Sequence, residues 1–171
     1  MVLLIKDLNG NHGSFSQCLY TILSEVDPCS SVIQKCLNSL KPEENQFIYN
    51  AVAENCVEVA THRHGCCVLQ RCLDHATEAQ RVQLVTEITY QCMTLVQDPF
   101  SNYVVQYCLE FDRRFVGAII RQFQGNVCAL SCHKFSSNVS SFPNFEQVAQ
   151  KAFVRSLRSA SGSQSQTGSG S

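Results

Sequence analysis

The sequence predicts an all-α protein, a curved α-solenoid built from repeated helical units. One six-residue string recurs at a constant spacing of 36 residues, as VIQKCL at 32–37, VLQRCL at 68–73 and VVQYCL at 104–109. Each copy spaces its apolar residues like the buried stripe of an amphipathic helix. Because one such helix cannot bury its stripe alone, neighbouring units must stack to form a continuous core.

Each predicted unit contains further segments besides the recurring string. Amphipathic runs that can supply the remaining helices lie at 45–58, 78–95 and 113–127. Short strings stand before the second and third copies, HRHGCC at 62–67 and DPFSNY at 98–103, and a fourth unit begins with HKFSSNV at 133–139. We expect the triplets HRH, DPF and HKF to be the connections that enter each polar-faced helix.

Composition narrows the class of protein. A chain of 171 residues with 44% hydrophobic content and a net charge of -1 suits one or two soluble folding units. The opening MVLLIKDLNG has too short an apolar run for a signal peptide or a membrane span, so we expect an intracellular protein without membrane contact. The eleven cysteines are an odd number and mostly fall in apolar helical patterns, which predicts buried, reduced thiols.

The polar face of the recurring helix carries two side chains one turn apart. Asn102 and Gln106 share this face, and the pair recurs 36 residues earlier as Cys66 and Gln70. Two such groups can meet the edge of a base, and Tyr103 between them can stack on a base for roughly 1–3 kcal/mol. Near-neutral charge disfavours binding through phosphates, so RNA would be bound by base edges and stacking. A solvated face and a protein-binding scaffold remain alternatives at this point.

Particular strings resemble a known family. GNH, GCC and SNY followed by V-x-Q, and then HKFSSNV, resemble repeats four to seven of the eight-repeat Pumilio homology domain of the PUF family. The resemblance covers roughly residues 1–139 apart from one interruption, as a partial array. It implies three-helix Pumilio repeats that read single-stranded RNA one base per repeat. It further implies cytoplasmic control of mRNA translation and stability through 3′-UTR elements, with mRNA decay or translation-repression proteins as partners and no DNA binding.

The resemblance also assigns residues. The base-edge positions fall on Asn11, Gln34, Cys66, Gln70, Asn102, Gln106 and Ser137. The stacking positions fall on His12, Cys67, Tyr103 and Asn138, of which Cys67 departs from the usual planar residue. When the family's base assignments are carried over to these positions, the resemblance implies that the Asn102 and Asn11 units read uracil. It implies that the Cys66 unit reads adenine and the Ser137 unit reads guanine. Because the family binds RNA antiparallel, the implied order is 5′-GUAU-3′ within a UGUA-type element.

The pattern breaks first inside the first unit. Nineteen residues at 13–31 separate the pair Asn11 and His12 from Gln34, and their removal would restore LNGNHVIQKCL. The segment contains glycine and the dipeptide Asp-Pro at 27–28, so we expect it to split the helix and to separate Asn11 from Gln34. A loop bulging from the solenoid and a retained in-frame intron of 57 nucleotides both explain it, and we favour the intron.

The second break follows HKFSSNV. Ser141 takes the place of the family's glutamate and Pro143 ends the helix, which weakens the guanine assignment. Residues 140–158 are expected to form a divergent end, with one short amphipathic helix over 145–159 that caps the array. Residues 159–171 are rich in Ser and Gly and are expected to be disordered. Only the units around Cys66 and Asn102 are then whole.

Other chemistries have weaker support in the sequence. Two clusters carry metal-ligand residue types, His62, His64, Cys66 and Cys67 in one and Cys128, Cys132 and His133 in the other. Neither has paired C-x-x-C spacing, so we expect no metal and no cofactor. Glycine-rich phosphate loops, nucleophile elbows and HExxH helices are absent, so we expect no enzyme. The alternatives to RNA binding are a protein-interaction solenoid and a misprocessed product without a function of its own.

Overall fold

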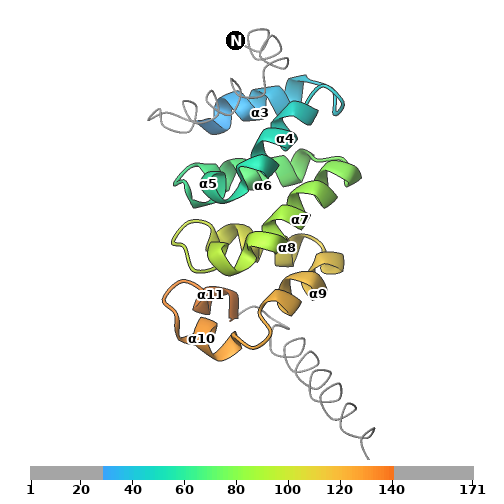
Figure 1. The fold of residues 1–171 in the computed structure, drawn as a ribbon. Coiled ribbons are helices and arrows are strands. Elements are labelled where there is room, and N and C mark those ends of the chain that lie inside the picture. The colour runs from blue at the N-terminus through green and yellow to red at the C-terminus, as the bar shows by residue number, and fades with distance from the viewer. Residues whose placement is uncertain (1–28, 141–171) are drawn as a thin grey trace, which may run out of the picture.

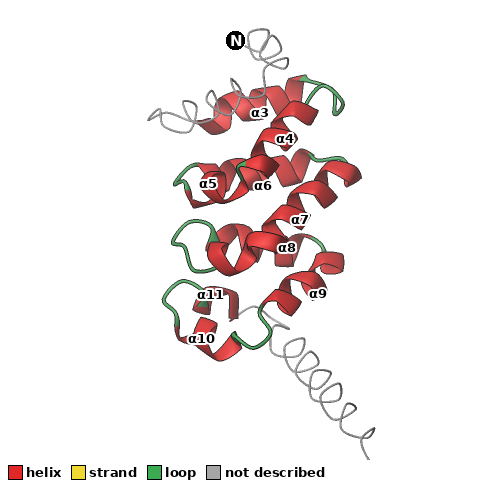
Figure 2. Ribbon diagram, viewed as in Figure 1, coloured by secondary structure: helices red, strands yellow, loops and turns green. Residues whose placement is uncertain are grey.

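The computed structural model describes residues 29–140, and all regular structure in this span is helical (Figure 2). The predicted all-α fold is therefore confirmed. The helices in chain order are α3 (Cys29–Ser39), α4 (Gln46–Glu54), α5 (Cys56–Thr61), α6 (Gly65–His75), α7 (Glu78–Leu95), α8 (Asn102–Phe111), α9 (Arg113–Gln122), α10 (Val127–Cys132) and α11 (Ser137–Ser140). None of these helices is long and apolar enough to cross a membrane.

The helices stack in successive layers from α3 at one end to α11 at the other (Figure 1). One column consists of α3, α6, α8 and α11, each in contact with the next. The second column consists of α4 with α5, then α7, then α9, and α7 contacts both α4 and α9. Each layer thus repeats the layer before it, which is the predicted solenoid.

Three connections lead into the first column in the same way, and they coincide with the predicted triplets. The side chain that opens each triplet accepts a backbone N–H two residues later. The bonds are His64 N–H to His62 Nδ1 at 3.2 Å, Phe100 N–H to Asp98 Oδ1 at 2.8 Å and Phe135 N–H to His133 Nδ1 at 3.3 Å. Such local bonds favour a turn over continued helix, so the triplets end one helix and start the next.

A second feature of these connections is a backbone carbonyl that the next helix approaches closely. Ser101 Oγ donates to the carbonyl of Leu95 at 2.7 Å, and Ser136 Oγ donates to the carbonyl of Leu130 at 2.6 Å. Gly65 holds the equivalent position before α6, where a Cβ atom would lie 1.9 Å from the carbonyl oxygen of Val59. The glycine is thus required by a close backbone approach.

In the second column, two of the three predicted amphipathic runs differ from the helices that the structure contains. The run at 78–95 is one continuous helix, α7, which begins with a capping box between Thr77 and Gln80. The run at 45–58 instead breaks at Asn55, whose Nδ2 donates to the carbonyl of Ala51 at 2.8 Å. The run at 113–127 ends earlier, at Gln122, and the chain turns through Gly125 with φ of 82° before α10. Asparagine and glycine disfavour helix, which explains both breaks.

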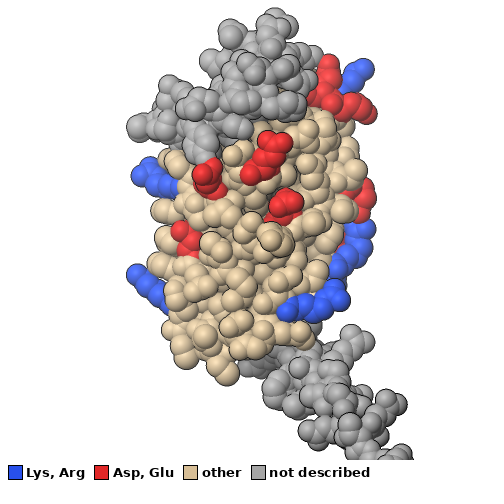
Figure 3. All heavy atoms as spheres, in the orientation of Figure 1, with Lys and Arg blue, Asp and Glu red and all other residues tan. Residues whose placement is uncertain are grey.

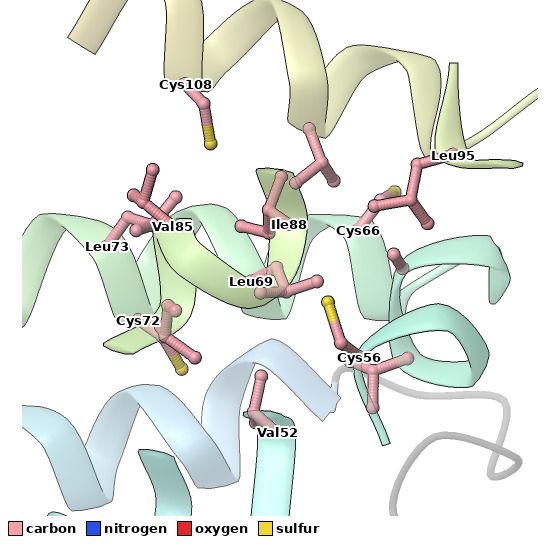
Figure 4. Close-up of a cluster of buried hydrophobic side chains, with 14 of the residues drawn as sticks. Val52, Cys56, Cys66, Leu69, Cys72, Leu73, Val85, Ile88, Leu95 and Cys108 are labelled. Carbon is pink, nitrogen blue, oxygen red and sulfur yellow. The ribbon is translucent and has the colours of Figure 1, made fainter. Parts of the chain in front are cut away.

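The core lies between the two columns and between successive layers. Figure 4 shows part of it, where Leu69, Leu73 and Ile88 pack among cysteine side chains. Of the nine cysteines between residues 36 and 132, all are free thiols and six are buried. The predicted buried, reduced thiols are confirmed for Cys36, Cys56, Cys66, Cys72, Cys92 and Cys108. The prediction was wrong for Cys67, Cys128 and Cys132, which are exposed.

The first break predicted in the sequence lies partly within the described residues. Cys29, Ser30 and Ser31 form the first turn of α3 and continue directly into Gln34. The helix thus begins directly after Pro28, and three residues assigned to the insertion are helical. Asn11, His12, residues 13–28, the predicted cap at 145–159 and the tail at 159–171 lie outside the described residues.

Replacing Gly65 with alanine should destabilise the protein by about 1–3 kcal/mol, because the added Cβ forces α6 away from the Val59 carbonyl. Gly117→Ala is the matched control, since a Cβ there meets nothing within 4 Å inside α9. The control should raise stability by about 0.5–1 kcal/mol, because alanine favours helix more than glycine does. Urea denaturation followed by circular dichroism measures both, and equal effects of the two variants would contradict the close approach.

Stability should fall as the pH rises above 9. Burial raises the pKa of Cys56, Cys72, Cys92 and Cys108 to about 12, from 9.0 for an ordinary thiol. Between these values the unfolded chain has lost thiol protons that the folded chain keeps, so rising pH favours unfolding. Thermal melts from pH 7 to pH 11 measure this loss of stability. Replacing Cys72 with alanine should make the melting temperature fall less steeply with pH. A melting temperature that stays constant above pH 9 would contradict this prediction.

Candidate functional site

The first column of helices presents equivalent positions in successive layers. In α6 and α8 the predicted base-edge pairs are Cys66 with Gln70 and Asn102 with Gln106. In both pairs the first residue is buried and the glutamine is half-buried. The stacking positions are exposed in both layers, with 54% of Tyr103 accessible and Cys67 likewise exposed. The structure thus places each predicted pair on one helix face, with an exposed residue beside it.

Asn102 is held by bonds on both ends of its amide. Its Nδ2 donates to the backbone carbonyls of Asp98 at 2.8 Å and Pro99 at 3.0 Å. Its Oδ1 accepts from Gln106 Nε2 at 3.0 Å. Both N–H donors of the amide are therefore used by the chain itself, and the Oδ1 atom is directed toward Gln106. Asn102 is fully buried, so Gln106 is the member of this pair that solvent reaches.

The fourth unit touches the third at this same amide. Asn138, the predicted stacking residue of α11, has its Nδ2 3.5 Å from Asn102 Oδ1. This distance marks a weak hydrogen bond. Ser137, the predicted base-edge residue, is half-buried and its Oγ donates to the carbonyl of Lys134 at 3.2 Å. The predicted stacking residue of the fourth unit therefore lies next to a predicted base-edge residue of the third unit.

The Cys66 layer has a different polar group at the same place. Burial is the main cause that raises the pKa of the Cys66 thiol to about 11, so the group stays protonated at neutral pH. Its Sγ donates to the carbonyl of Arg63 at 3.4 Å and lies 4.0 Å from Cys67 Sγ. The pair at α6 thus offers a neutral thiol and the amide of Gln70, with no charge on either group.

The sequence reasoning missed the residues that follow each glutamine. Lys35 on α3 and Arg71 on α6 hold equivalent positions and are exposed. Tyr107 holds that position on α8, and its hydroxyl donates to the Asp74 carboxylate at the C-terminal end of α6. The signal was present in the strings QK, QR and QY, where a long polar side chain follows glutamine in each copy. These residues add two cations and one bond between layers to the polar face.

Charge elsewhere is dispersed. Figure 3 shows one face of the molecule, on which Lys, Arg, Asp and Glu side chains are scattered among uncharged residues. The clearest ion pairs join Arg114 to Glu78 at 2.7 Å and to Asp112 at 2.5 Å, which links α9 to α7. These side chains are largely exposed apart from Asp112, so the pairs add little to stability.

The metal-ligand residue types found in the sequence have other roles here. His62 and His133 accept backbone N–H groups in their connections, through Nδ1 in both cases. Burial and the neighbouring His64 and Arg63 lower the pKa of His62. Within residues 29–140, no group of three or more His, Cys, Asp or Glu side chains is arranged to hold a metal ion.

Comparison with known proteins gives one consistent family. The family model of the Pumilio-family RNA binding repeat matches residues 30–53, 55–89, 91–113 and 126–139. A Pumilio domain-containing protein of Schizosaccharomyces pombe is 51% identical over 140 residues, which cover 81% of this chain and 18% of that protein. Pumilio homology domain family member 4 of Saccharomyces cerevisiae is 43% identical over 158 residues, covering 90% of this chain and 15% of that protein. The chain thus spans about a fifth or less of the length of these relatives.

Solved structures give the same result. The Puf4 RNA binding domain bound to HO endonuclease RNA 3′ UTR recognition sequence aligns with a TM-score of 0.72 and 36% identity, covering 88% of this chain and 48% of that one. The RNA-binding domain of yeast Puf5p bound to SMX2 RNA aligns with a TM-score of 0.68 and 29% identity, covering 81% of this chain and 43% of that one. The chain spans about half of each domain.

Replacing Asn102 with aspartate should lower the free energy of unfolding by about 1–3 kcal/mol. The substitution keeps the shape of the side chain but turns the Nδ2 donor into an oxygen that faces the carbonyls of Asp98 and Pro99. Gln70→Glu is the matched control, because Gln70 holds the position on α6 that Gln106 holds on α8 and is likewise half-buried. Chemical denaturation compares the two variants, and an Asn102→Asp protein as stable as the parent would contradict the bonding described for this amide.

Proposed function

The chain belongs to the Pumilio family, and on this basis we propose that it binds single-stranded RNA and reads one base with each helical unit. The observation that carries this proposal is the repeated pair on the first column, one turn apart, beside an exposed stacking position. Proteins that read unstacked RNA bases combine stacking with hydrogen bonds to the base edges. This is a binding function rather than an enzymatic one, as the family's RNA binding repeat supports.

The proposed assignment of bases follows the pairs. Cys66 and Gln70 read adenine, and Asn102 and Gln106 read the uracil on its 5′ side, with Tyr103 stacked between neighbouring bases. The α11 unit reads the base before that uracil through Ser137, so the ligand contains a UGUA-type element. In support, the similar Puf4 and Puf5p domains are both bound to RNA in their solved structures.

The mode of binding follows from the charge. With a net charge of -1, the chain has little general attraction for phosphates. Stacking on Tyr103 and bonds from the glutamines then supply most of the free energy, with local help from the Lys35 and Arg71 cations. Affinity should therefore depend less on salt concentration than it does for a basic nucleic-acid-binding protein.

The biological role that we propose is control of mRNA. A Puf4 domain similar to this chain is bound to a 3′ UTR recognition sequence, which supports mRNA 3′-UTRs as the source of the ligand. Binding there would regulate translation and stability in the cytoplasm through recruited decay or translation-repression proteins. A protein-interaction solenoid is the alternative, and it requires no preference among RNA sequences.

Replacing Tyr103 with alanine should weaken binding of a short UGUA-containing RNA roughly 5- to 150-fold, since stacking contributes about 1–3 kcal/mol per base. Tyr90→Ala is the matched control, because Tyr90 is also exposed, at 76%, but lies on α7 in the second column. Fluorescence polarisation with a labelled RNA measures both variants against a scrambled RNA.

The parent chain should prefer the UGUA-containing RNA, and Tyr90→Ala should bind it as the parent does. Equal binding of the scrambled RNA would remove the case for sequence reading and leave the protein-interaction solenoid. Equal losses in the two tyrosine variants would place the RNA somewhere other than the first column.

A further inference from the structure

Two grooves lie one layer apart on the second column of helices, in which α4, α7 and α9 follow one another (Figure 1). The first, here called the acidic groove, lies between α4 and α7, and its walls are formed by Asn50, Ala53, Glu54, Gln83 and Glu87. The second, here called the tyrosine groove, lies between α7 and α9, and its walls include Thr86, Thr89, Tyr90, Phe115, Ala118 and Gln122. Neither groove includes a residue of the column that is proposed to bind RNA.

The two grooves occupy equivalent places in successive layers. Glu54 on α4 and Tyr90 on α7 are 36 positions apart in the sequence. On the opposite walls, Glu87 on α7 and Gln122 on α9 are 35 positions apart, as are the first residues of these two helices. One groove therefore repeats the other in position, while a tyrosine and a glutamine replace its two carboxylates.

The acidic groove carries negative charge without a counter-ion. It continues past the helix break at Asn55 to α5, where Glu58 adds a third carboxylate to Glu54 and Glu87. Within residues 29–140, none of the three carboxylates forms an ion pair. Acidic side chains lie over α4, α5 and α7 on the face shown in Figure 3, with uncharged residues between them. A groove lined by charge of one sign attracts a ligand of the opposite sign, so this groove favours a cation.

The tyrosine groove is apolar and exposed. Tyr90 is 76% accessible, the highest value among the large hydrophobic side chains of the described residues. Val82, at 44%, lies two turns before it on the same face of α7. Phe115 on α9 is half-buried and forms the opposite wall. Exposed apolar surface that borders a groove is typical of an interaction site, so this groove favours an apolar side chain.

Size and spacing indicate what kind of ligand fits both grooves. Their volumes are about 300 Å³ and 280 Å³, at the lower end of the range of about 300–1,000 Å³ for small-molecule pockets, so each suits one side chain. Packed helices lie about 8–10 Å apart. An extended polyproline II segment rises about 3.1 Å per residue with three residues per turn, so side chains three positions apart lie about 9 Å apart on one face. Such a segment matches the spacing of the layers.

We propose that the acidic and tyrosine grooves together bind an extended segment of a partner protein, in which a lysine or arginine stands three positions from an apolar residue. The basic side chain lies among Glu54, Glu58 and Glu87, and the apolar side chain packs on Tyr90 and Phe115. This surface is on the second column, so the partner and an RNA on the first column can be bound at the same time. The inference does not depend on the proposed function.

The test uses the full chain without RNA and a labelled peptide in which lysine and leucine alternate at every third position, with serine between them. Such a peptide presents the pair in both chain directions. Fluorescence polarisation should show binding, and Tyr90→Ala should weaken it about tenfold, as expected for an aromatic contact at the centre of an interface. Glu87→Gln should weaken binding about two- to fivefold, because exposed ion pairs contribute modestly. Glu110→Gln is the matched control, since Glu110 is exposed on α8 outside both grooves, and it should bind as the parent does.

Two control peptides test the chemistry of the ligand. A peptide with glutamate in place of lysine should not bind, and a peptide of the same composition with its lysines and leucines in separate blocks should bind more weakly than the alternating one. Equal binding of either control peptide, no binding of the alternating peptide, or equal affinities of the parent and folded Tyr90→Ala would overturn the inference. Sedimentation velocity tests a second copy of this chain as the occupant. Self-association of the parent that Tyr90→Ala abolishes would likewise overturn the inference, because the grooves would then be an interface between copies.

Discussion

The structure depends on the burial of one apolar stripe per helix against the next layer. In α6 and α8 the same positions face the core, at Leu69 and Cys72 in one helix and Val105 and Cys108 in the other, and all four are at most 1% exposed. Since this packing fixes how each helix is rotated, it also fixes which residues appear on the polar face. The spacing of the candidate base-reading pairs is therefore a consequence of core packing, and the polar residues do not have to establish it themselves.

The connections set how the layers are joined. In each of the three, a backbone carbonyl near the end of the preceding helix lies against the first residues of the next, whether a serine hydroxyl donates to it or a glycine makes room for it. Serine gives the carbonyl a side-chain donor in addition to the backbone N–H that it already accepts, whereas glycine allows a closer approach. The units are thus similar in geometry but differ in how the same carbonyl is accommodated.

Much of this arrangement could be predicted from the sequence, because it follows from periodicity. The 36-residue repeat, the polar pairs and the connecting triplets depend on local spacing, and the residues at Gln70 and Gln106 occupy the expected faces. Three features could not be predicted. The helix break at Asn55 depends on a side-chain bond to the backbone, whereas the equivalent Gln91 stays helical. The burial of Asn102 depends on three neighbours at once, and nothing in the repeat pattern indicated that residues 29–31 are helical.

The Asn102 amide forms hydrogen bonds within the chain through both its nitrogen and its oxygen. This bonding has a consequence for the affinity of the proposed site for RNA. Under the proposed function, a base would reach this amide oxygen in conformers where Gln106 and Asn138 have moved away from it. The apparent dissociation constant at this layer would then be the intrinsic one divided by the fraction of open conformers. An opening free energy of about 1.4 kcal/mol would weaken binding tenfold. Asn138, which belongs to the next unit, would then compete with a base for the Asn102 oxygen, so under the proposed function two neighbouring units would not read their bases independently.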